Sequence, residues 1–367
     1  MGDVVFRVDA SLEIGTGHVM RCLALAEALG RRGVTSRFIC RDHEGHLAQR
    51  ISRHGHRVDL LASGACPPAQ RASGQAGQPA HVAWLGADWK TDASQSIAML
   101  ADARPDWLVI DHYALDSTWE QALRPFCRRM MAIDDLADRR HDVNLLLDQN
   151  LGRSADDYTG LLPTGSTVLA GARYALLRPE FSAWRERSLA RRTDARLRRL
   201  LVSLGGVDKD NVTGQVLAAL LKCELPQDCR ISVVMGEQAP WLDAVREQAA
   251  AMPMVDVQVG VADVAALMAD CDLAIGAAGT SAWERCCVGL PTLLVVLAAN
   301  QVPGARALRA AGAALLLGEG DELAASLKAA IERMADPAML QAQQKACAEV
   351  TDGLGTARIV EALFGAA

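Results

Sequence analysis

The sequence predicts an α/β protein built from two Rossmann-like, doubly wound domains. Short β-rich runs alternate with helix-like runs along the whole chain, which is the pattern of parallel sheets covered by helices. The length of 367 residues exceeds what one hydrophobic core usually holds, so two domains are expected. Ligands of such sheets bind at the carboxyl ends of the strands, and we expect two facing domains to form a cleft there.

The first domain is expected over residues 1–180. Its strands are predicted at residues 4–8, 35–40, 108–110 and 130–133. Apolar residues recur at helical spacing from Val19 to Leu29, and Gly30 ends this helix. Residues 62–80 are rich in small and polar residues without periodicity, so we expect a surface loop there.

A second series of strands predicts the second domain over residues 181–355. Its six strands are expected at residues 200–204, 230–235, 255–259, 272–275, 292–297 and 313–317, with a helical segment between successive strands. Six strands joined by right-handed crossovers form one Rossmann-like sheet. The basic stretch 185–199 is expected to be a solvated helix face. The last segment, 356–367, is expected to be a helix that packs back on the first domain.

Bulk composition argues against several classes of protein. The net charge of −6 gives no general attraction to nucleic acid or to anionic membranes. The N-terminus lacks a secretory signal pattern, and the apolar run 290–299 is about half as long as a membrane-spanning helix. The ten cysteines are scattered without a CxxC pair, so we expect reduced core residues rather than disulfides or metal ligands. These features predict a cytoplasmic protein without nucleic-acid or membrane partners.

The first candidate site is the loop between the first strand and the first helix. Gly15 and Gly17 precede the helix, where small residues let main-chain N–H groups approach a ligand. The loop matches neither the GxGxxG motif nor a P-loop. His18 lies in the first helical turn, where the helix dipole disfavours a protonated imidazole. A neutral imidazole can accept a proton from water, so His18 is a candidate general base; alternatively it caps the helix or binds phosphate.

Two glycine-rich turns follow strands of the second domain. One contains Gly205 and Gly206, and the other contains Gly279, Thr280 and Ser281. Small residues at a helix start expose N–H groups that can hold a diphosphate without a lysine. The alternative for each turn is tight packing of helix on strand. Two such turns in one sheet indicate a nucleotide site, with Glu284 as an acceptor for ribose hydroxyls.

Polar residues at other strand ends complete the candidates. Asn300 and Gln301 follow the strand at 292–297, and an adjacent amide pair can cap a helix, bind a ligand, or both. Asp9 is the candidate to orient His18, although aspartate at a strand end often caps a turn. Asp111 and His112 are expected to face the same cleft, and a metal site built from them is an alternative.

Taken in order, these segments resemble the UDP-2,4-diacetamido-2,4,6-trideoxy-β-L-altropyranose hydrolases of pseudaminic acid biosynthesis over nearly the whole chain. The matching segments are residues 9–11, 14–22, 111–113, 134–139, 147–150, 174–181, 203–206, 279–284 and 300–301. The stretch 62–80 matches no motif of this family and is expected to be an insertion.

The resemblance implies the GT-B fold, in which two Rossmann-like domains face an interdomain cleft, close to the enzyme that adds N-acetylglucosamine to the peptidoglycan lipid carrier. It implies hydrolysis of a UDP-sugar to UDP and the free amino sugar, without a metal or other cofactor, for flagellin or surface glycans. By resemblance, His18 is the general base, while Tyr113 and Asn300 line the sugar pocket.

Two other functions stay open at this point. A glycosyltransferase of the same fold would move the sugar to an acceptor hydroxyl, and would release UDP only when an acceptor is present. A non-catalytic nucleotide-sugar sensor would keep both glycine-rich turns but would not need His18.

Overall fold

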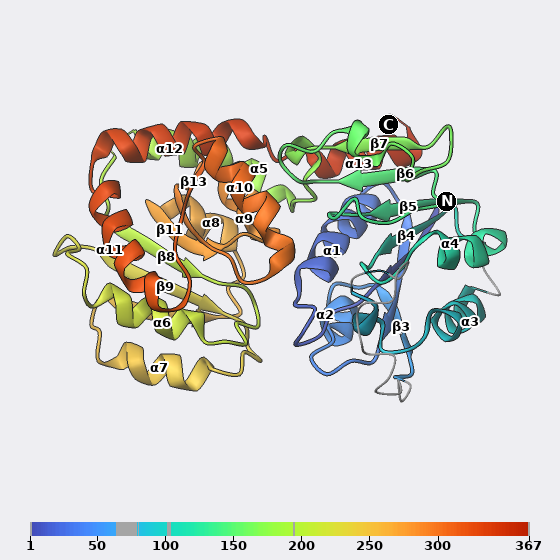
Figure 1. The fold of residues 1–367 in the computed structure, drawn as a ribbon, viewed down its shortest axis with the longest axis horizontal. Helices are drawn as coiled ribbons and strands as arrows, with labels where there is room; N and C mark the ends of the chain where they lie inside the picture. Colours follow the sequence, from blue (N-terminus) through green and yellow to red (C-terminus); the bar gives the residue numbers. More distant parts are fainter. Residues whose placement is uncertain (1, 64–78, 80, 101–103, 194, 366–367) are drawn as a thin grey trace. The chain divides into compact units, whose positions relative to one another are not determined.

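The computed structural model describes residues 2–63, 79, 81–100, 104–193 and 195–365, and the chain divides into two compact units (Figure 1). The first unit comprises Met1–Leu176 and Thr356–Ala367, and the second comprises Leu177–Gly355. Most of the stretch 62–80, predicted as a surface loop, lies outside the described residues.

The described part of the first unit contains one parallel sheet with the strand order β3-β2-β1-β4-β5-β6-β7. The strands are β1 (Asp3–Val8), β2 (Thr35–Arg41), β3 (Arg57–Leu61), β4 (Trp107–Asp111), β5 (Arg129–Ile133), β6 (Leu145–Asp148) and β7 (Thr167–Ala170). The four predicted strands are confirmed as β1, β2, β4 and β5. The prediction did not include β3, β6 and β7, because these strands are short and β3 carries charged residues.

Helices cover both faces of this sheet. The helices α1 (Gly17–Gly30), α2 (Ala48–Arg53) and α13 (Gly355–Phe364) share a core with alternate residues of β1, among them Phe6. The helices α3 (Trp89–Leu100) and α4 (Ser117–Leu123) pack on the other face. Burial on both faces explains why β1 and β4 are almost continuously apolar. The indole of Trp107 also donates to the main-chain oxygen of Leu363 in α13 at 3.0 Å.

The second unit contains a parallel sheet with the strand order β10-β9-β8-β11-β12-β13. The strands are β8 (Arg199–Ser203), β9 (Arg230–Met235), β10 (Val255–Val259), β11 (Leu273–Ala277), β12 (Thr292–Val295) and β13 (Ala314–Leu316). All six predicted strands are confirmed, with shifts of one or two residues at some ends. Numbered within the unit, this is the order 3-2-1-4-5-6 of a Rossmann sheet.

The helices of the second unit alternate with its strands. They are α5 (Pro179–Arg191), α6 (Val212–Leu220), α7 (Leu242–Ala250), α8 (Val264–Asp270), α9 (Ser281–Cys287), α10 (Val302–Ala310), α11 (Leu323–Met334) and α12 (Pro337–Val350). The prediction of a solvated basic face at 185–199 is correct for residues such as Arg187 and Arg191, which are exposed, but wrong for Arg185 and Arg192. Arg185 donates to main-chain oxygens of Ala348 and Thr351, and Arg192 is only 4% exposed. These guanidiniums instead hold α5 onto the unit through main-chain carbonyls.

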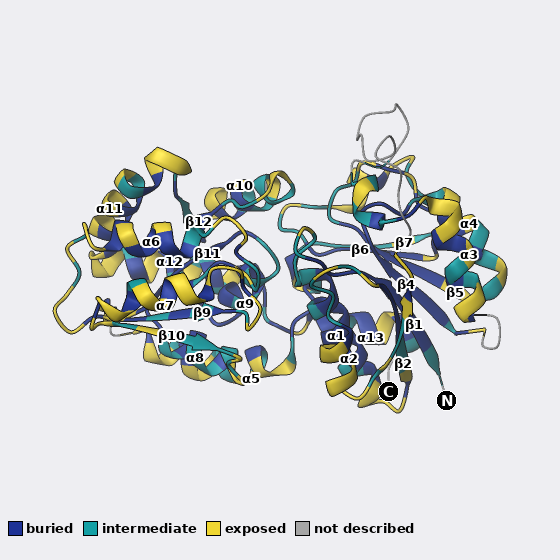
Figure 2. Ribbon diagram, turned by 90° about the horizontal axis from the view of Figure 1, so that it is seen from below, coloured by how far each residue is buried: buried dark blue, intermediate teal, exposed yellow. Residues whose placement is uncertain are grey.

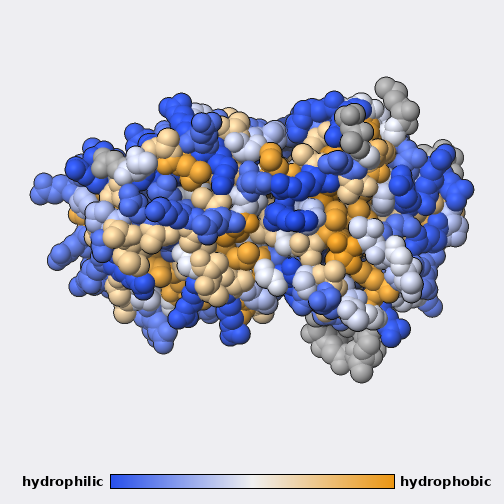
Figure 3. Space-filling model, turned by 90° about the horizontal axis from the view of Figure 1, so that it is seen from above, coloured by the Kyte–Doolittle hydropathy of each residue, from blue (hydrophilic) through white to orange (hydrophobic). Residues whose placement is uncertain are grey.

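Burial follows the layered architecture of each unit. The strands are mostly buried, while exposed residues lie on the outer helix faces and loops (Figure 2). Hydrophilic side chains cover much of the face drawn in Figure 3, with apolar residues in smaller areas. Within the described residues, no helix combines the length and apolarity needed to cross a bilayer. The described cysteines are free, and all of them except Cys223 are buried.

Candidate active site

The carboxyl edge of the first sheet gathers the polar residues of the first unit. Val8 at the end of β1 pairs with Asp111 at the end of β4. The strand order reverses between these two neighbours, which is where doubly wound sheets bind ligands. The loop after β1 therefore starts beside Asp111.

The loop after β1 is a tight turn that leads into α1. The Ser11 hydroxyl accepts hydrogen bonds from the N–H groups of Glu13 and Ile14 at 3.1 and 2.9 Å. Gly15 has a φ of 79°, which favours glycine. Its N–H donates to the Ser11 carbonyl at 2.9 Å, so the expected free donor at Gly15 is not available. The turn places His18 in the first turn of α1.

His18 pairs with Asp111 at the sheet edge. Its Nδ1 lies 2.6 Å from Asp111 Oδ1, and its side chain is 10% exposed. So short a contact with a carboxylate assigns the proton to Nδ1 and leaves Nε2 as the acceptor. Nε2 has no hydrogen-bond partner among the described residues. An aspartate that fixes the histidine tautomer in this way prepares the free nitrogen to act as a base.

Asp111, not Asp9, is therefore the carboxylate that orients His18. Arg21 also binds Asp111 in a bidentate manner, with Nε 2.7 Å from Oδ2 and Nη2 2.6 Å from Oδ1. Burial alone would raise the pKa of Asp111, but Arg21 and His18 outweigh it and hold this pKa well below its usual value. Asp111 thus stays ionised and accepts a hydrogen bond from His18 Nδ1–H.

Tyr113 completes a closed set of contacts around the histidine. Its ring meets the His18 imidazole edge-on, with centroids 4.7 Å apart. Its hydroxyl donates to Asp135 Oδ2 at 2.6 Å, and Arg21 Nη1 lies 2.6 Å from the same oxygen. Burial and the neighbouring Asp135 raise the pKa of Tyr113 well above its usual value. The network fixes the imidazole from both sides.

The expectation that Asp111 and His112 face the same side is wrong, because successive side chains point to opposite faces of a sheet. His112 Nε2 lies 3.2 Å from Asp9 Oδ2, and its Nδ1 accepts from the Ala114 N–H at 3.1 Å. Asp9 is also bound by Arg7 Nη1 at 2.6 Å and by the Arg41 N–H at 2.7 Å. Asp9 and His112 thus form a buried support behind β1; the Asp9 carboxylate is bound by its neighbours, whereas His112 Nε2 makes no hydrogen bond with the described residues.

Sequence reasoning missed several contributors to this site. Arg21 was detectable, because it lies three residues after His18 on the same face of α1. His81 and Trp84, from the segment with the short helix η2 (Val82–Leu85), are half-buried aromatic neighbours of Tyr113. The ring centroid of Tyr113 lies 5.4 Å from that of His81 and 5.8 Å from that of Trp84. No motif marked these two rings, since only the fold brings them to Tyr113.

Asp148 ends β6 beside this network. It is buried and accepts hydrogen bonds from the Tyr158 hydroxyl and the Asn150 amide, both at 2.9 Å. Asn150 Nδ2 also lies 3.2 Å from Asp135 Oδ1. Burial, with a contribution from the Asp135 charge, raises the pKa of Asp148 from 3.8 to about 7. Asp148 is therefore a carboxyl group that titrates near neutral pH.

This raised pKa predicts a pH-dependent stability. The contribution of Asp148 is fully present below its unfolded pKa of 3.8 and is lost as the pH rises through about 7. We expect the unfolding free energy to fall by up to about 1.4 kcal/mol per pH unit over this interval. Urea denaturation of Asp148→Asn should show a flatter pH dependence, whereas the exposed control Asp156→Asn should retain the wild-type slope. An unchanged slope in Asp148→Asn would contradict the assignment.

In the second unit, the turn after β8 differs from the expectation of exposed N–H groups. The Asp208 carboxylate accepts from the N–H groups of Val212 and Thr213, both at 2.9 Å, and Asn211 caps the N–H of Gly214 at 3.2 Å. The start of α6 is thus satisfied within the chain.

Gly205 and Gly206 precede this capped helix. Gly205 has a φ of 98°, in the region that favours glycine. The carbonyl oxygen of Gly206 lies 2.0 Å from where a Cβ on Gly236 would stand. Close approach between the two main chains therefore accounts for part of this glycine pattern.

The turn after β11 keeps the features expected of a nucleotide site. The main-chain N–H groups of Thr280 and Ser281 form no hydrogen bond with the described residues, and the Thr280 side chain does not cap α9. The space next to the Gly279 Cα is open, since a Cβ there would contact only Gln301 Nε2, at 3.7 Å. Glu284 is half-buried without a described hydrogen-bond partner, and burial raises its pKa. An acceptor in this position suits ribose hydroxyls.

Asn300 and Gln301 follow β12 in the short helix η6 (Ala299–Gln301). The Gln301 side chain accepts from the Leu297 N–H at 3.0 Å, which closes its own turn. Asn300 does not cap α10, because the N-cap position is Gln301, so this part of the expectation is wrong. The half-buried Asn300 amide has no partner among the described residues.

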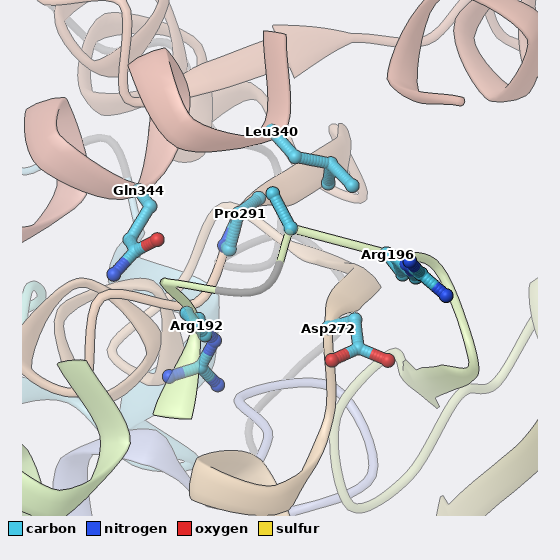
Figure 4. A pocket seen from close by; sticks show the side chains of 7 residues that line it. Arg192, Arg196, Asp272, Pro291, Leu340 and Gln344 are labelled. Carbon is cyan, nitrogen blue, oxygen red and sulfur yellow. The ribbon is translucent and has the colours of Figure 1, made fainter. Parts of the chain in front are cut away.

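A separate small pocket lies at the other end of the second sheet (Figure 4). Its lining residues are Arg192, Ala195, Arg196, Asp272, Pro291, Leu340 and Gln344. Asp272 directly precedes β11, whereas Gly279 and Ser281 follow that strand. The pocket is therefore distinct from the predicted nucleotide turn. Across the residues that the structure covers, no three His, Cys, Asp or Glu side chains are arranged to hold a metal ion.

The two parallel sheets and their helices form the GT-B fold of nucleotide-sugar glycosyltransferases. MurG from Acinetobacter baumannii matches with a TM-score of 0.67 and 15% identity over 99% of both chains. The UDP-GlcNAc 2-epimerase from Neisseria meningitidis, bound to UDP-GlcNAc, matches with a TM-score of 0.59 and 12% identity over the whole of both chains. At these identities the likeness establishes the fold alone.

Sequence comparison relates the chain to nucleotide-sugar proteins. Residues 204–358 match the glycosyltransferase family 28 C-terminal domain. The chain is 34% identical over 154 residues to spore coat polysaccharide biosynthesis protein SpsG of Bacillus subtilis, covering 42% of this chain and 44% of SpsG. It is 25% identical over 245 residues to the UDP-2,4-diacetamido-2,4,6-trideoxy-β-L-altropyranose hydrolase of Campylobacter jejuni, covering 66% of this chain and 73% of that enzyme.

A third relative is an uncharacterized protein of Methanocaldococcus jannaschii, 22% identical over 299 residues, with 80% of this chain and 55% of that protein covered. The chain thus spans about half the length of this relative and of SpsG.

Proposed function

We propose that the protein hydrolyses a UDP-sugar, with UDP-2,4-diacetamido-2,4,6-trideoxy-β-L-altropyranose as the substrate. The products are UDP and free 2,4-diacetamido-2,4,6-trideoxy-L-altrose. The observation that carries the proposal is the His18–Asp111 pair, whose Nδ1–Oδ1 contact of 2.6 Å leaves Nε2 free. The similarity to the Campylobacter jejuni hydrolase supports the choice of substrate.

In the proposed mechanism, His18 Nε2 removes a proton from water as the water oxygen bonds to the anomeric carbon. The bond from that carbon to the β-phosphate oxygen breaks, and UDP leaves with the electron pair. A positioned base contributes about two to four orders of magnitude to such a step. The ring of Tyr113 lies beside the base, and the rings of Trp84 and His81 lie beside Tyr113. These rings suit contact with the acetamido and deoxy groups of the sugar.

The second unit is proposed to bind the UDP part of the substrate. Thr280 and Ser281 offer main-chain donors to the diphosphate, Glu284 accepts from the ribose, and Asn300 offers a free amide to the sugar. Preorganised donors stabilise charge that develops on a leaving diphosphate, so a separate general acid is not required.

Glycosyl transfer is the second candidate, because the family 28 domain match covers residues 204–358. The two functions differ in their need for an acceptor. Incubating the protein with the UDP-sugar alone should release UDP and free sugar at the full rate, as followed by mass spectrometry. UDP release that depends strictly on an added acceptor would favour transfer, and binding without any turnover would favour a sensor.

A further inference from the structure

Arg285 is a buried cation directly behind the turn after β11. Its guanidinium is in the interior, with the residue 1% exposed. Nη2 donates to the Ala277 carbonyl at 2.6 Å and Nη1 donates to Ser281 Oγ at 3.1 Å. Nε has no partner among the described residues. A guanidinium has five N–H donors, so most of the hydrogen-bonding capacity of Arg285 is unused.

No carboxylate of the described residues lies within ion-pair distance of Arg285. A buried charge is normally paired, because removal from water is costly without a counter-charge. Burial accordingly lowers the pKa of Arg285. The fold therefore retains a buried positive charge that makes no direct ion pair, although the charge of the neighbouring Glu284 acts favourably on it.

Other buried arginines of the chain are compensated in ways that Arg285 is not. Arg7 and Arg21 each pair with an aspartate at 2.6 Å. Arg192 has no such partner, but it donates to four main-chain oxygens, those of Ser188, Met268, Cys271 and Val288. Arg285 has one main-chain acceptor and one hydroxyl acceptor. Its contacts thus do not explain why a full charge is kept there.

The position of this charge indicates an anionic ligand. A Cβ on Gly276 would lie 2.6 Å from Arg285 Nη1, so the guanidinium packs directly against the end of β11. The residues that Arg285 contacts, Ala277 and Ser281, bracket the turn that contains the unpaired N–H group of Thr280. The cation and the unpaired main-chain donors are therefore concentrated in one turn.

We propose that Arg285 is a positioning residue that gives this turn its affinity for the phosphates of a nucleoside diphosphate. It acts through Ser281, whose hydroxyl it orients, and through its charge behind the main-chain donors. The inference rests on the proposed function, because it assigns the same turn to the diphosphate. The charge of Arg285 also accounts for the absence of a lysine from the turn that contains Gly279, Thr280 and Ser281.

Calorimetric titration of the full chain with uridine, UMP and UDP tests this role. Arg285→Gln should weaken UDP binding by about 10- to 100-fold, the range for hydrogen bonds to charged groups, and should leave uridine affinity within about two-fold. Arg285→Lys keeps the charge and should keep most of the preference for UDP over uridine. Glu284→Gln serves as the contrast, since loss of a ribose contact should weaken uridine and UDP by the same factor.

Equal weakening of uridine and UDP in Arg285→Gln would show a purely structural role and overturn the inference, as would unchanged UDP affinity. Should the Gln variant not fold, Arg285→Met fills similar space without the charge and takes its place. Wild-type protein that binds no UDP would instead refute the proposed nucleotide site itself, and the inference with it.

Discussion

Replacing His18 with asparagine should lower kcat by about 10²- to 10⁴-fold, the contribution of a positioned general base. The asparagine amide can still donate to Asp111 where Nδ1 does, but it offers no counterpart to Nε2. The local structure should therefore survive while the base is lost. UDP affinity should stay within about two-fold, because the proposed nucleotide contacts belong to the second unit.

Steady-state kinetics with the UDP-sugar and calorimetry with UDP measure both parts of this expectation. His54→Asn is a matched control, since His54 is a surface residue of the same unit that contacts Glu27 at 2.7 Å. A His18→Asn enzyme that turns over at nearly the wild-type rate would remove His18 from the mechanism.

Asp111→Asn should produce the second large loss, a fall in kcat of about 10²-fold or more, because the amide no longer fixes the Nδ1–H tautomer of His18. It should also destabilise the fold, since Arg21 loses one of its two carboxylate partners. Removing one member of a buried ion pair typically costs about 3–5 kcal/mol. Because Arg21 keeps Asp135, we expect the lower end of that range.

The double variant Asp111→Asn with Arg21→Met separates the two effects. In Asp111→Asn alone, Arg21 loses its Asp111 partner. When Arg21 is also replaced by Met, that cation is gone, so the double variant should recover part of the lost stability. The kcat should remain low, because the tautomer of His18 is still not fixed. Recovery of kcat together with the unfolding free energy would mean that Asp111 only supports the fold.

Much of the architecture follows from local sequence patterns. Parallel sheets buried on both faces give continuous apolar strands, and such runs predicted β1, β4 and most strands of the second sheet, whereas the edge strand β10 was predicted from alternating valines. Short strands with charged or exposed residues, such as β3 (Arg57–Leu61), lack that signal. His18 could be placed at the start of α1 because Gly15 and Gly17 mark the turn before it.

The partner of His18 could not be read from the sequence. It depends on the pairing of Val8 with Asp111 across a separation of more than 100 residues, and on which face of β4 each side chain occupies. A shift of one residue would have turned His112 towards His18.

The caps of α6 were missed for a different reason. The two glycines drew attention to a ligand, while Asp208 and Asn211 satisfy the same N–H groups within the chain.

The most direct test of the mechanism is turnover of the UDP-sugar in ¹⁸O-labelled water without an acceptor. Attack on the anomeric carbon by water that His18 activates predicts label in the sugar at early times and none in the released UDP. Label in the β-phosphate of UDP would show attack on phosphorus, and absence of any UDP release without an acceptor would rule out hydrolysis. Either result would contradict the account.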